Sequence, residues 1–363
     1  MGACTSKSGP RRMDTWAAGD PDAAATEGRS TDATLPATER DGNIYLHDSN
    51  TPVSCVVTTT GNVCASGWDD GTIKLIDFNA RCVVRSWSAH SRSVNRMVVG
   101  ARSSSLYSCS RDTTIVRHSL IDTLSTAAPT TFAGHSLTVS ALALDPTETR
   151  LASGSRDTSV ILWDAATATQ MQHTSTSQNI VTCMAWVPTE AQVVAQGGED
   201  LRLRFWDART WKTPAQTIEG YVYFPLAMAC SLDGHYVFTS SKGFNAVGCE
   251  GRVWDRRTGK QVVEMTGHSQ DATACAFLPH QCVQWNADEG ITASKDSSVR
   301  VWNTMTGELL ASTQDGGAGM FTSLACVEPA SKDDQRTRIL ASSFSGRIDM
   351  YEWDRTKRSL ELV

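Results

Sequence analysis

The sequence lacks the features that mark several large classes of protein. Among its 363 residues no apolar run approaches the roughly 20 residues that a membrane-spanning helix requires, and none follows the first methionine as in a secretory signal. The eleven cysteines are odd in number and show no C-x-x-C spacing, which indicates neither a disulfide framework nor a zinc site. We therefore expect a reducing compartment, cysteines that act as small buried apolar residues, and no metal or other cofactor.

Positive charge is also scarce. The 33 lysines and arginines face 39 aspartates and glutamates, so the formal net charge is -6. This balance argues against nucleic acid as the main partner, because phosphate binding needs a basic face. Hydrophobic residues make up 40% of the chain, which is enough for a core, and the length suits two or three ordinary domains or one large all-β domain.

The first forty-two residues contain almost no large apolar side chains. They include no valine, isoleucine, phenylalanine or tyrosine, and Leu35 is their only branched aliphatic residue. Such a segment cannot bury enough apolar surface to offset the entropy of ordering it. We predict that residues 1–42 form a disordered tether with a reach of about 35 Å, and that residues 43–363 fold.

The tip of this predicted tether fits an acylation pattern. Gly2 follows the initial methionine, and Ser6 stands at the hydroxyl position of the N-myristoylation pattern. One myristoyl chain binds a membrane only reversibly, so a second signal is needed, and Cys4 is a candidate for palmitoylation. We predict lipidation at Gly2 and Cys4; the alternative is a chance match in a disordered tail.

One phrase recurs through the rest of the chain. It consists of an apolar run, small residues, a turn with aspartate, a second apolar run and then Trp-Asp, and it is clearest in residues 151–164, 195–207 and 291–303. The turn aspartates are spaced by 42, 45 and 43 residues, at Asp70, Asp112, Asp157 and Asp200.

This pattern resembles the WD40 family, whose repeats of about 40–45 residues each supply four strands of a propeller blade. The resemblance runs from about residue 44 to the last residue and implies an all-β, seven-bladed WD40 β-propeller. Either residues 44–46 or residues 360–362 are expected to complete the last blade, and the sequence leaves open which. Inner strands are expected to begin near Val53, Val94, Val139, Val181, Leu226, Thr273 and Thr322.

Polar residues recur at fixed places in the repeat. A serine, a histidine and an aspartate together suggest nucleophilic catalysis, but a catalytic set has no reason to recur by blade, whereas a buried network that fixes each turn does. We therefore predict structural tetrads and no enzyme activity. The third repeat holds His135, Ser153, Asp157 and Trp163, the sixth holds His268, Thr292, Asp296 and Trp302, and the second holds part of a set in His90, Ser108 and Asp112.

Departures from the repeat predict binding surfaces. The turn in the fifth repeat is longer and lacks its aspartate, and the connection before it carries tyrosines where Gly-His is expected. We predict an exposed aromatic patch there, suited to a protein partner; the alternative is that these side chains fold back over the blade. The residues concerned are Tyr221, Tyr223, Phe244 and Glu250.

A Trp-Asp-x-Arg sequence occurs in two successive repeats and ends at Arg209 and Arg257. It resembles the signature of substrate receptors that dock on the adaptor of cullin-4 ubiquitin ligases, and this resemblance would make the two arginines contact residues. The alternative is that each arginine pairs with a neighbouring loop, because exposed arginines alone contribute little energy.

Segments in the fourth to sixth repeats resemble a narrower group, the WD repeat-containing protein 31 family. They are residues 179–188, 233–235, 243–250 and 275–279. The resemblance implies a non-enzymatic ciliary or flagellar protein that works beside GTPase-activating proteins for Arf-like GTPases in intraflagellar transport and BBSome cycling. We accordingly expect a monomeric, membrane-tethered protein-interaction scaffold in the cytoplasm, at the cilium, the flagellum or its base.

Overall fold

The structure, a computed structural model, describes residues 44–45, 51–100, 102–120, 129–176, 179–243, 245–279, 288–314, 319–327 and 335–363. All of these belong to one unit, Thr34–Val363. The predicted tether, residues 1–42, lies outside the described residues. Among the described residues there is no helix that is long and apolar enough to cross a membrane.

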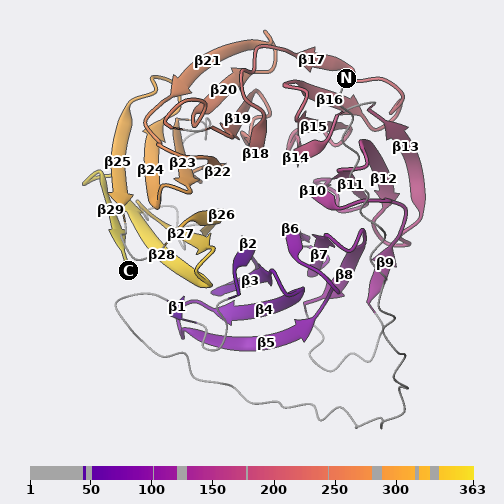
Figure 1. Cartoon of the computed structure of the whole chain (residues 1–363), viewed down its shortest axis with the longest axis horizontal. Coiled ribbons are helices and arrows are strands. Elements are labelled where there is room, and N and C mark those ends of the chain that lie inside the picture. The colour runs from indigo at the N-terminus through magenta and orange to yellow at the C-terminus, as the bar shows by residue number, and fades with distance from the viewer. Residues whose placement is uncertain are drawn as a thin grey trace, which may run out of the picture. The chain divides into compact units, whose positions relative to one another are not determined.

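The described strands form seven antiparallel sheets, six of four strands and one of five. Each sheet is a blade, and the blades surround a central axis with β2, β6, β10, β14, β18, β22 and β26 innermost (Figure 1). The predicted all-β seven-bladed propeller is therefore confirmed. Within each of the first six blades the strands run from the centre outward in chain order.

The strand bounds are as follows. Blades one and two contain β2 (Val53–Thr58), β3 (Val63–Trp68), β4 (Thr72–Asp77), β5 (Cys82–Ser88), β6 (Val94–Gly100), β7 (Ser105–Ser110), β8 (Ile115–Ser119) and β9 (Thr130–Phe132). Blades three and four contain β10 (Val139–Leu144), β11 (Arg150–Ser155), β12 (Ser159–Asp164), β13 (Gln170–Ser175), β14 (Val181–Trp186), β15 (Val193–Gly198), β16 (Leu203–Asp207) and β17 (Gln216–Ile218). Blades five and six contain β18 (Pro225–Cys230), β19 (Tyr236–Ser241), β20 (Gly251–Asp255), β21 (Lys260–Met265), β22 (Ala272–Phe277), β23 (Glu289–Ser294), β24 (Ser298–Asn303) and β25 (Leu309–Gln314). Blade seven contains β26 (Phe321–Val327), β27 (Arg336–Ser343), β28 (Arg347–Asp354), β29 (Ser359–Leu362) and β1 (Ile44–Tyr45).

The predicted starts of the inner strands agree with the structure to within one residue. Four begin at the predicted valines, and the other three begin one residue earlier, at Pro225, Ala272 and Phe321. The sequence pattern that located these strands has its origin in the burial of the strands of each blade. The second and third strands of a blade are buried on both faces, whereas the outermost strand alternates between exposed and half-buried residues.

Both candidates for the last strand close the propeller. β28 has eight residues, and β1 pairs with its first half while β29 pairs with its second half, with Ile44 opposite Ile348 and Leu360 opposite Trp353. The long outer edge of β28 is thereby covered by two short strands from the two ends of the described chain. Blade seven is also joined to blade one, because the Thr322 hydroxyl donates to the Val53 carbonyl at 2.6 Å.

The small residues of the second strands let neighbouring blades approach closely. A Cβ atom added at Gly154 would lie 2.2 Å from Cγ1 of Val181, the first residue of the next inner strand. Gly67 faces Val94 in the same way, at 2.7 Å. Glycine is required there because a larger residue would push the blades apart.

Replacing Gly154 with alanine is therefore expected to cost about 1–3 kcal/mol of unfolding free energy through overpacking. Urea titration followed by tryptophan fluorescence measures this cost. The Val181→Ala substitution should be less destabilising in the Gly154→Ala background than in the wild type, because it makes room for the new methyl group. Equal costs in the two backgrounds would show that the two side chains do not compete for space.

Candidate functional site

In blade three the predicted tetrad forms a buried chain of hydrogen bonds. Nδ1 of His135 lies 3.0 Å from Oδ2 of Asp157, and its Nε2 lies 2.7 Å from the hydroxyl of Ser153. Because a carboxylate only accepts, the ring carries its proton on Nδ1, and Nε2 accepts from Ser153. Trp163 completes the set by donating Nε1–H to the same hydroxyl at 2.8 Å.

Blade six repeats this arrangement with threonine in place of serine. His268 lies 3.1 Å from the Asp296 carboxylate and 2.8 Å from the Thr292 hydroxyl, which also accepts from Trp302 at 2.8 Å. The second oxygen of Asp296 accepts from the backbone and the hydroxyl of Ser298, at 3.0 and 2.6 Å. The aspartate thus ties the turn between the second and third strands to the loop that precedes the inner strand.

These sets serve structure and not chemistry. Ser153 has no exposed surface and its hydroxyl already has two partners, so it cannot reach a substrate. Burial lowers the pKa of His135, so the ring is held neutral. Burial alone would raise the pKa of Asp157, but hydrogen bonds from Ser159 and Ser136, with the nearby His135, lower it to about 2. Such a carboxylate stays charged and anchors the turn.

Blade two contains a variant that the sequence analysis missed. The Ser108 hydroxyl lies 2.8 Å from His90 and 3.3 Å from Nε2 of His118, which occupies the place of the tetrad tryptophan. The available signal was spacing, since His118 follows Ser108 by ten residues, as Trp163 follows Ser153. Burial, together with the charges of His90 and Arg85, lowers the pKa of His118 to about 4.

Blade five replaces the tetrad histidine with Tyr221, which corrects one prediction. Its hydroxyl lies 3.0 Å from that of Thr239, the counterpart of Ser153, and its ring centroid lies 4.7 Å from that of Trp254. Tyr221 is 5% exposed, so it is not part of an exposed aromatic patch. In blade four Gln196 takes the serine position and accepts from Trp206 at 2.9 Å.

Two other members of the predicted patch, Tyr223 and Glu250, contact the long turn of this blade. Tyr223 is half-buried, and a Cβ atom at Gly248 would lie 2.3 Å from its ring. Glu250 accepts from the Gly248 backbone at 2.9 Å and pairs with Arg252 at 3.4 Å. Phe244 lies outside the described residues. Among the residues of these loops that the structure describes, the exposed large apolar side chains are Val222 and Val247.

Arg209 and Arg257 occupy equivalent turns between the third and fourth strands of blades four and five. Nε of Arg209 donates to Asp207 at 2.9 Å and Nε of Arg257 donates to Asp255 at 3.3 Å, so each arginine pairs within its own turn. Their side chains are 71% and 54% exposed. The structure therefore leaves both on the surface of one face.

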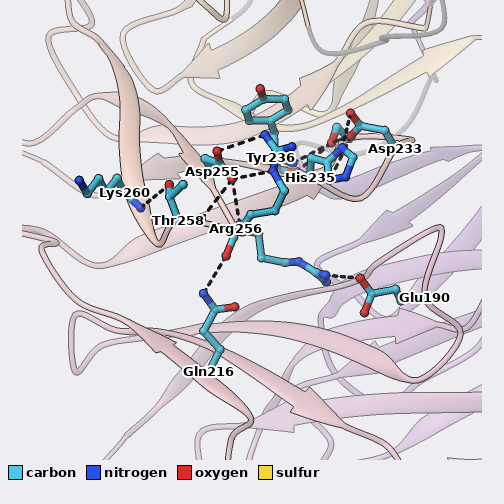
Figure 2. A network of polar contacts seen from close by, with 11 residues as sticks. Glu190, Gln216, Asp233, His235, Tyr236, Asp255, Arg256, Thr258 and Lys260 are labelled. Atoms are coloured by element: carbon cyan, nitrogen blue, oxygen red, sulfur yellow. Dashed lines mark hydrogen bonds and ion pairs between the residues drawn. The ribbon is translucent and has the colours of Figure 1, made fainter.

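The neighbouring Arg256 has a different role, which Figure 2 shows. Its guanidinium pairs with Glu190 of blade four, and its backbone carbonyl accepts from Gln216 of the same blade at 2.7 Å. Its backbone N–H donates to the His235 carbonyl at 2.8 Å. Arg256 thus links two blades, whereas Arg257 beside it faces solvent.

A cavity of about 510 Å³, here called the channel mouth, lies at one end of the central axis. Most of its lining belongs to two rings of residues, one from each blade in each ring. The upper ring is the residue that follows each second strand, and the lower ring is the second residue of each inner strand. The upper ring is Asp69, Arg111, Arg156, Glu199, Lys242, Lys295 and Phe344, and the lower ring is Ser54, Asn95, Ser140, Thr182, Leu226, Thr273 and Thr322.

The sequence analysis did not identify the channel mouth. Alignment of the seven repeats by their turns would have placed the upper ring in one register. Among the described residues, no group of three or more His, Cys, Asp or Glu side chains is arranged to hold a metal ion. The nine cysteines there are free, and six are buried.

One family model and several known proteins match parts of this chain. The model "WD domain, G-beta repeat" of the WD40 family matches residues 128–164, 167–207 and 259–303. The anaphase-promoting complex subunit cdc20 of Dictyostelium discoideum is 27% identical over 263 residues, which are 69% of this chain and 48% of that protein. Human Coronin-7 is 26% identical over 134 residues, which are 35% of this chain and 13% of that protein. The WD repeat-containing protein srw1 of Schizosaccharomyces pombe is 26% identical over 175 residues, which are 46% of this chain and 28% of that protein. The chain spans less than half the length of each of these relatives.

The Ser153→Ala variant should lose about 2–4 kcal/mol of unfolding free energy, because it leaves two buried ring nitrogens, on His135 and Trp163, without their partner. Denaturant titration measures the loss. The exposed Ser136 is the matched control, and its alanine variant should stay within about 0.5 kcal/mol of the wild type. A neutral Ser153→Ala variant would contradict the structural role of the tetrad.

Acidification below pH 6.5 should destabilise the fold, in part through His118. The unfolded histidine binds a proton near pH 6.5 and the folded one only near pH 4, so the unfolded state binds more protons between these values. The free energy of unfolding therefore decreases as the pH is lowered through this window, by on the order of 3 kcal/mol for this residue. The His118→Gln variant should show a shallower loss in urea titrations at pH 7, 5.5 and 4.5. The exposed His173→Gln variant should keep the wild-type slope, and identical slopes in all three proteins would refute the assignment.

Proposed function

We propose that this protein is a non-enzymatic WD40-repeat scaffold that binds other proteins with the faces of its propeller, while an acylated N-terminal tether holds it at a membrane. The observation that carries the scaffold function is the burial of the histidine tetrads. In blades two, three and six the residues suited to chemistry are occupied in fixing turns. What remains for function is the surface that those turns present.

The closed ring suits such a role. A rigid propeller holds several loops in fixed positions at once, so that partners on different faces are brought together. The family match supports protein binding as the activity, and one relative is named as a subunit of the anaphase-promoting complex.

The proposed membrane attachment rests on the sequence at Gly2 and Cys4. Two acyl chains hold a protein on a bilayer much more firmly than one. A scaffold anchored in this way raises the effective concentration of its partners at the membrane.

The resemblance to the WD repeat-containing protein 31 family supports a more specific proposal. We place the scaffold at the cilium or flagellum, where it would assist intraflagellar transport and BBSome cycling together with regulators of Arf-like GTPases. This part of the proposal depends on the motifs in blades four to six.

A second candidate is a substrate receptor of a cullin-4 ubiquitin ligase. The observation that favours it is the matched exposure of Arg209 and Arg257 in equivalent turns of adjacent blades. Under this alternative those arginines would contact the ligase adaptor.

Live imaging of the full-length protein tests the proposed attachment. The wild type should concentrate at the ciliary base or membrane, whereas Gly2→Ala and Cys4→Ser variants should become diffuse, since each lacks one acyl chain. Mass spectrometry of the purified protein should show the acyl groups directly. Equal, diffuse distribution of all three proteins would refute membrane tethering.

A pull-down of the cullin-4 adaptor separates the two candidates. We expect the wild type to capture no adaptor. If it does, and if the Arg209→Ala/Arg257→Ala variant loses the adaptor, the receptor function replaces the scaffold proposal. Lys357→Ala is the matched control, because Lys357 is an exposed cation that pairs with Asp354 in the corresponding turn of blade seven.

A further inference from the structure

We propose that the channel mouth is a docking site for a segment of a partner protein that carries acidic side chains and one large apolar side chain. This inference rests on the proposed scaffold function and names one of its binding surfaces. It is independent of the proposed tether and of the ciliary location.

The charge of the channel mouth differs from that of the whole chain. The chain has a net charge of -6, yet the residues that line this cavity are five basic and three acidic. Lys295 is neutralised by Asp271 at 2.7 Å. Among the described residues, neither Arg111 nor Arg156 has a carboxylate within ion-pairing distance, so adjacent blades two and three present two uncompensated guanidinium groups. The basic residues are Arg96, Arg111, Arg156, Lys242 and Lys295, and the acidic ones are Asp69, Glu199 and Asp271.

Both arginines are held on fixed backbone. The Arg111 N–H donates to the Ser93 carbonyl at 3.0 Å, and the Arg156 N–H donates to the Thr138 carbonyl at 2.9 Å. Each is followed directly by the tetrad aspartate of its blade, so the buried hydrogen bonds described above also fix the position of the arginine. Their side chains are exposed. Exposed guanidinium groups carried on such a fixed backbone can bind carboxylates with paired, charge-assisted hydrogen bonds.

The floor of the cavity is already satisfied. Four polar side chains of the lower ring donate to the first residue of the next inner strand, as Asn95 does to Val139 at 2.7 Å and Thr273 does to Phe321 at 2.9 Å. Arg96 donates to the Leu226 carbonyl at 3.2 Å and so connects blade two to blade five across the channel. A ligand therefore finds its free hydrogen-bond donors at the rim, on Arg111 and Arg156.

A different sector of the rim is apolar. Phe344 and Met320 of blade seven are each 44% exposed, and they are neighbours because the Phe344 N–H donates to the Met320 carbonyl at 2.9 Å. Phe224 of blade five also lines the cavity, with Nζ of Lys242 5.0 Å from its ring. Exposed apolar side chains beside a cavity mark interaction sites.

These two sectors define the ligand. An acidic side chain suits the sector of Arg111 and Arg156, and a phenylalanine, leucine or methionine side chain suits the sector of Phe344 and Met320. A nucleic acid fits poorly, because it carries a phosphate at every nucleotide and places some of them against Asp69 and Glu199, whereas a protein segment can place its acidic side chains at the two arginines alone. An extended protein segment that crosses the cavity satisfies both sectors at once.

Fluorescence anisotropy with a labelled ten-residue peptide, containing four glutamates around one phenylalanine, tests the proposal on the full-length protein. The wild type should bind with a Kd below about 100 µM. Binding should weaken when salt is raised, because the charges are partly exposed. Peptides with glutamine for glutamate, or with serine for phenylalanine, should each bind at least about tenfold more weakly.

The protein variants locate the site. Arg111→Glu/Arg156→Glu should weaken binding at least about tenfold and Phe344→Ser about threefold or more, with unfolding curves like that of the wild type because these side chains are exposed. Lys212→Glu/Lys357→Glu is the matched control, since it reverses two exposed cations in turns away from the channel mouth, and it should bind normally. No binding by the wild type up to 1 mM, or equal loss in both double variants, would overturn the proposal.

Two other occupants are distinguishable outcomes that would also overturn it. Concentration-dependent dimerisation in light scattering that Arg111→Glu/Arg156→Glu abolishes would identify a second copy as the occupant. Peptide binding that appears only after the seven acidic residues between positions 14 and 41 are made neutral would identify the protein's own N-terminal segment. Failure of peptide binding leaves the localisation results of the Gly2 and Cys4 variants unaffected, so this inference and the proposed membrane tether fail separately.

Discussion

The buried histidine–aspartate hydrogen bond is the interaction on which the rest of this propeller depends. In blades two, three and six this bond joins the loop before the inner strand to the turn between the second and third strands of the same blade. Because the histidine is buried and neutral and the aspartate is charged, the bond occupies the very groups that would be needed for acid–base or nucleophilic chemistry. The same bond thus orders the turn and occupies these particular groups.

The blades that lack this bond show how the requirement is met in other ways. In blade five the Tyr221 hydroxyl forms a hydrogen bond with that of Thr239, and in blade four the Gln196 amide oxygen accepts a hydrogen bond from the indole N–H of Trp206. These replacements satisfy buried polar groups without a histidine–aspartate bond, and the turn of blade five, which lacks its aspartate, is longer. Among the described residues, Nε1 of Trp254 has no hydrogen-bond partner, because Thr239 is engaged by Tyr221 and by the Arg252 carbonyl.

The two faces of the ring offer different surfaces for partners. One carries Arg209 and Arg257 in repeated turns, each already paired with an aspartate of its own turn. The other carries the channel mouth, where Arg111 and Arg156 have no such pair within the described part of the chain and where the rim includes the exposed Phe344. Desolvating an unpaired guanidinium against a partner carboxylate gives more specificity than competing with a local aspartate. This difference is why we assign the main docking role to the channel mouth.

The sequence by itself determined the number of blades, the starts of the inner strands and the two complete tetrads, because each depends on a pattern that lies within one repeat. Tertiary structure alone decided the rest. The division of β28 between β1 and β29, the burial of Tyr221 and the link from Arg256 to Glu190 all involve residues that are distant in the chain. The channel mouth takes residues from every blade, so it exists only when the ring closes. A repeat encodes its own blade through local periodicity, but it contains no information on which side chains of other blades will stand beside it.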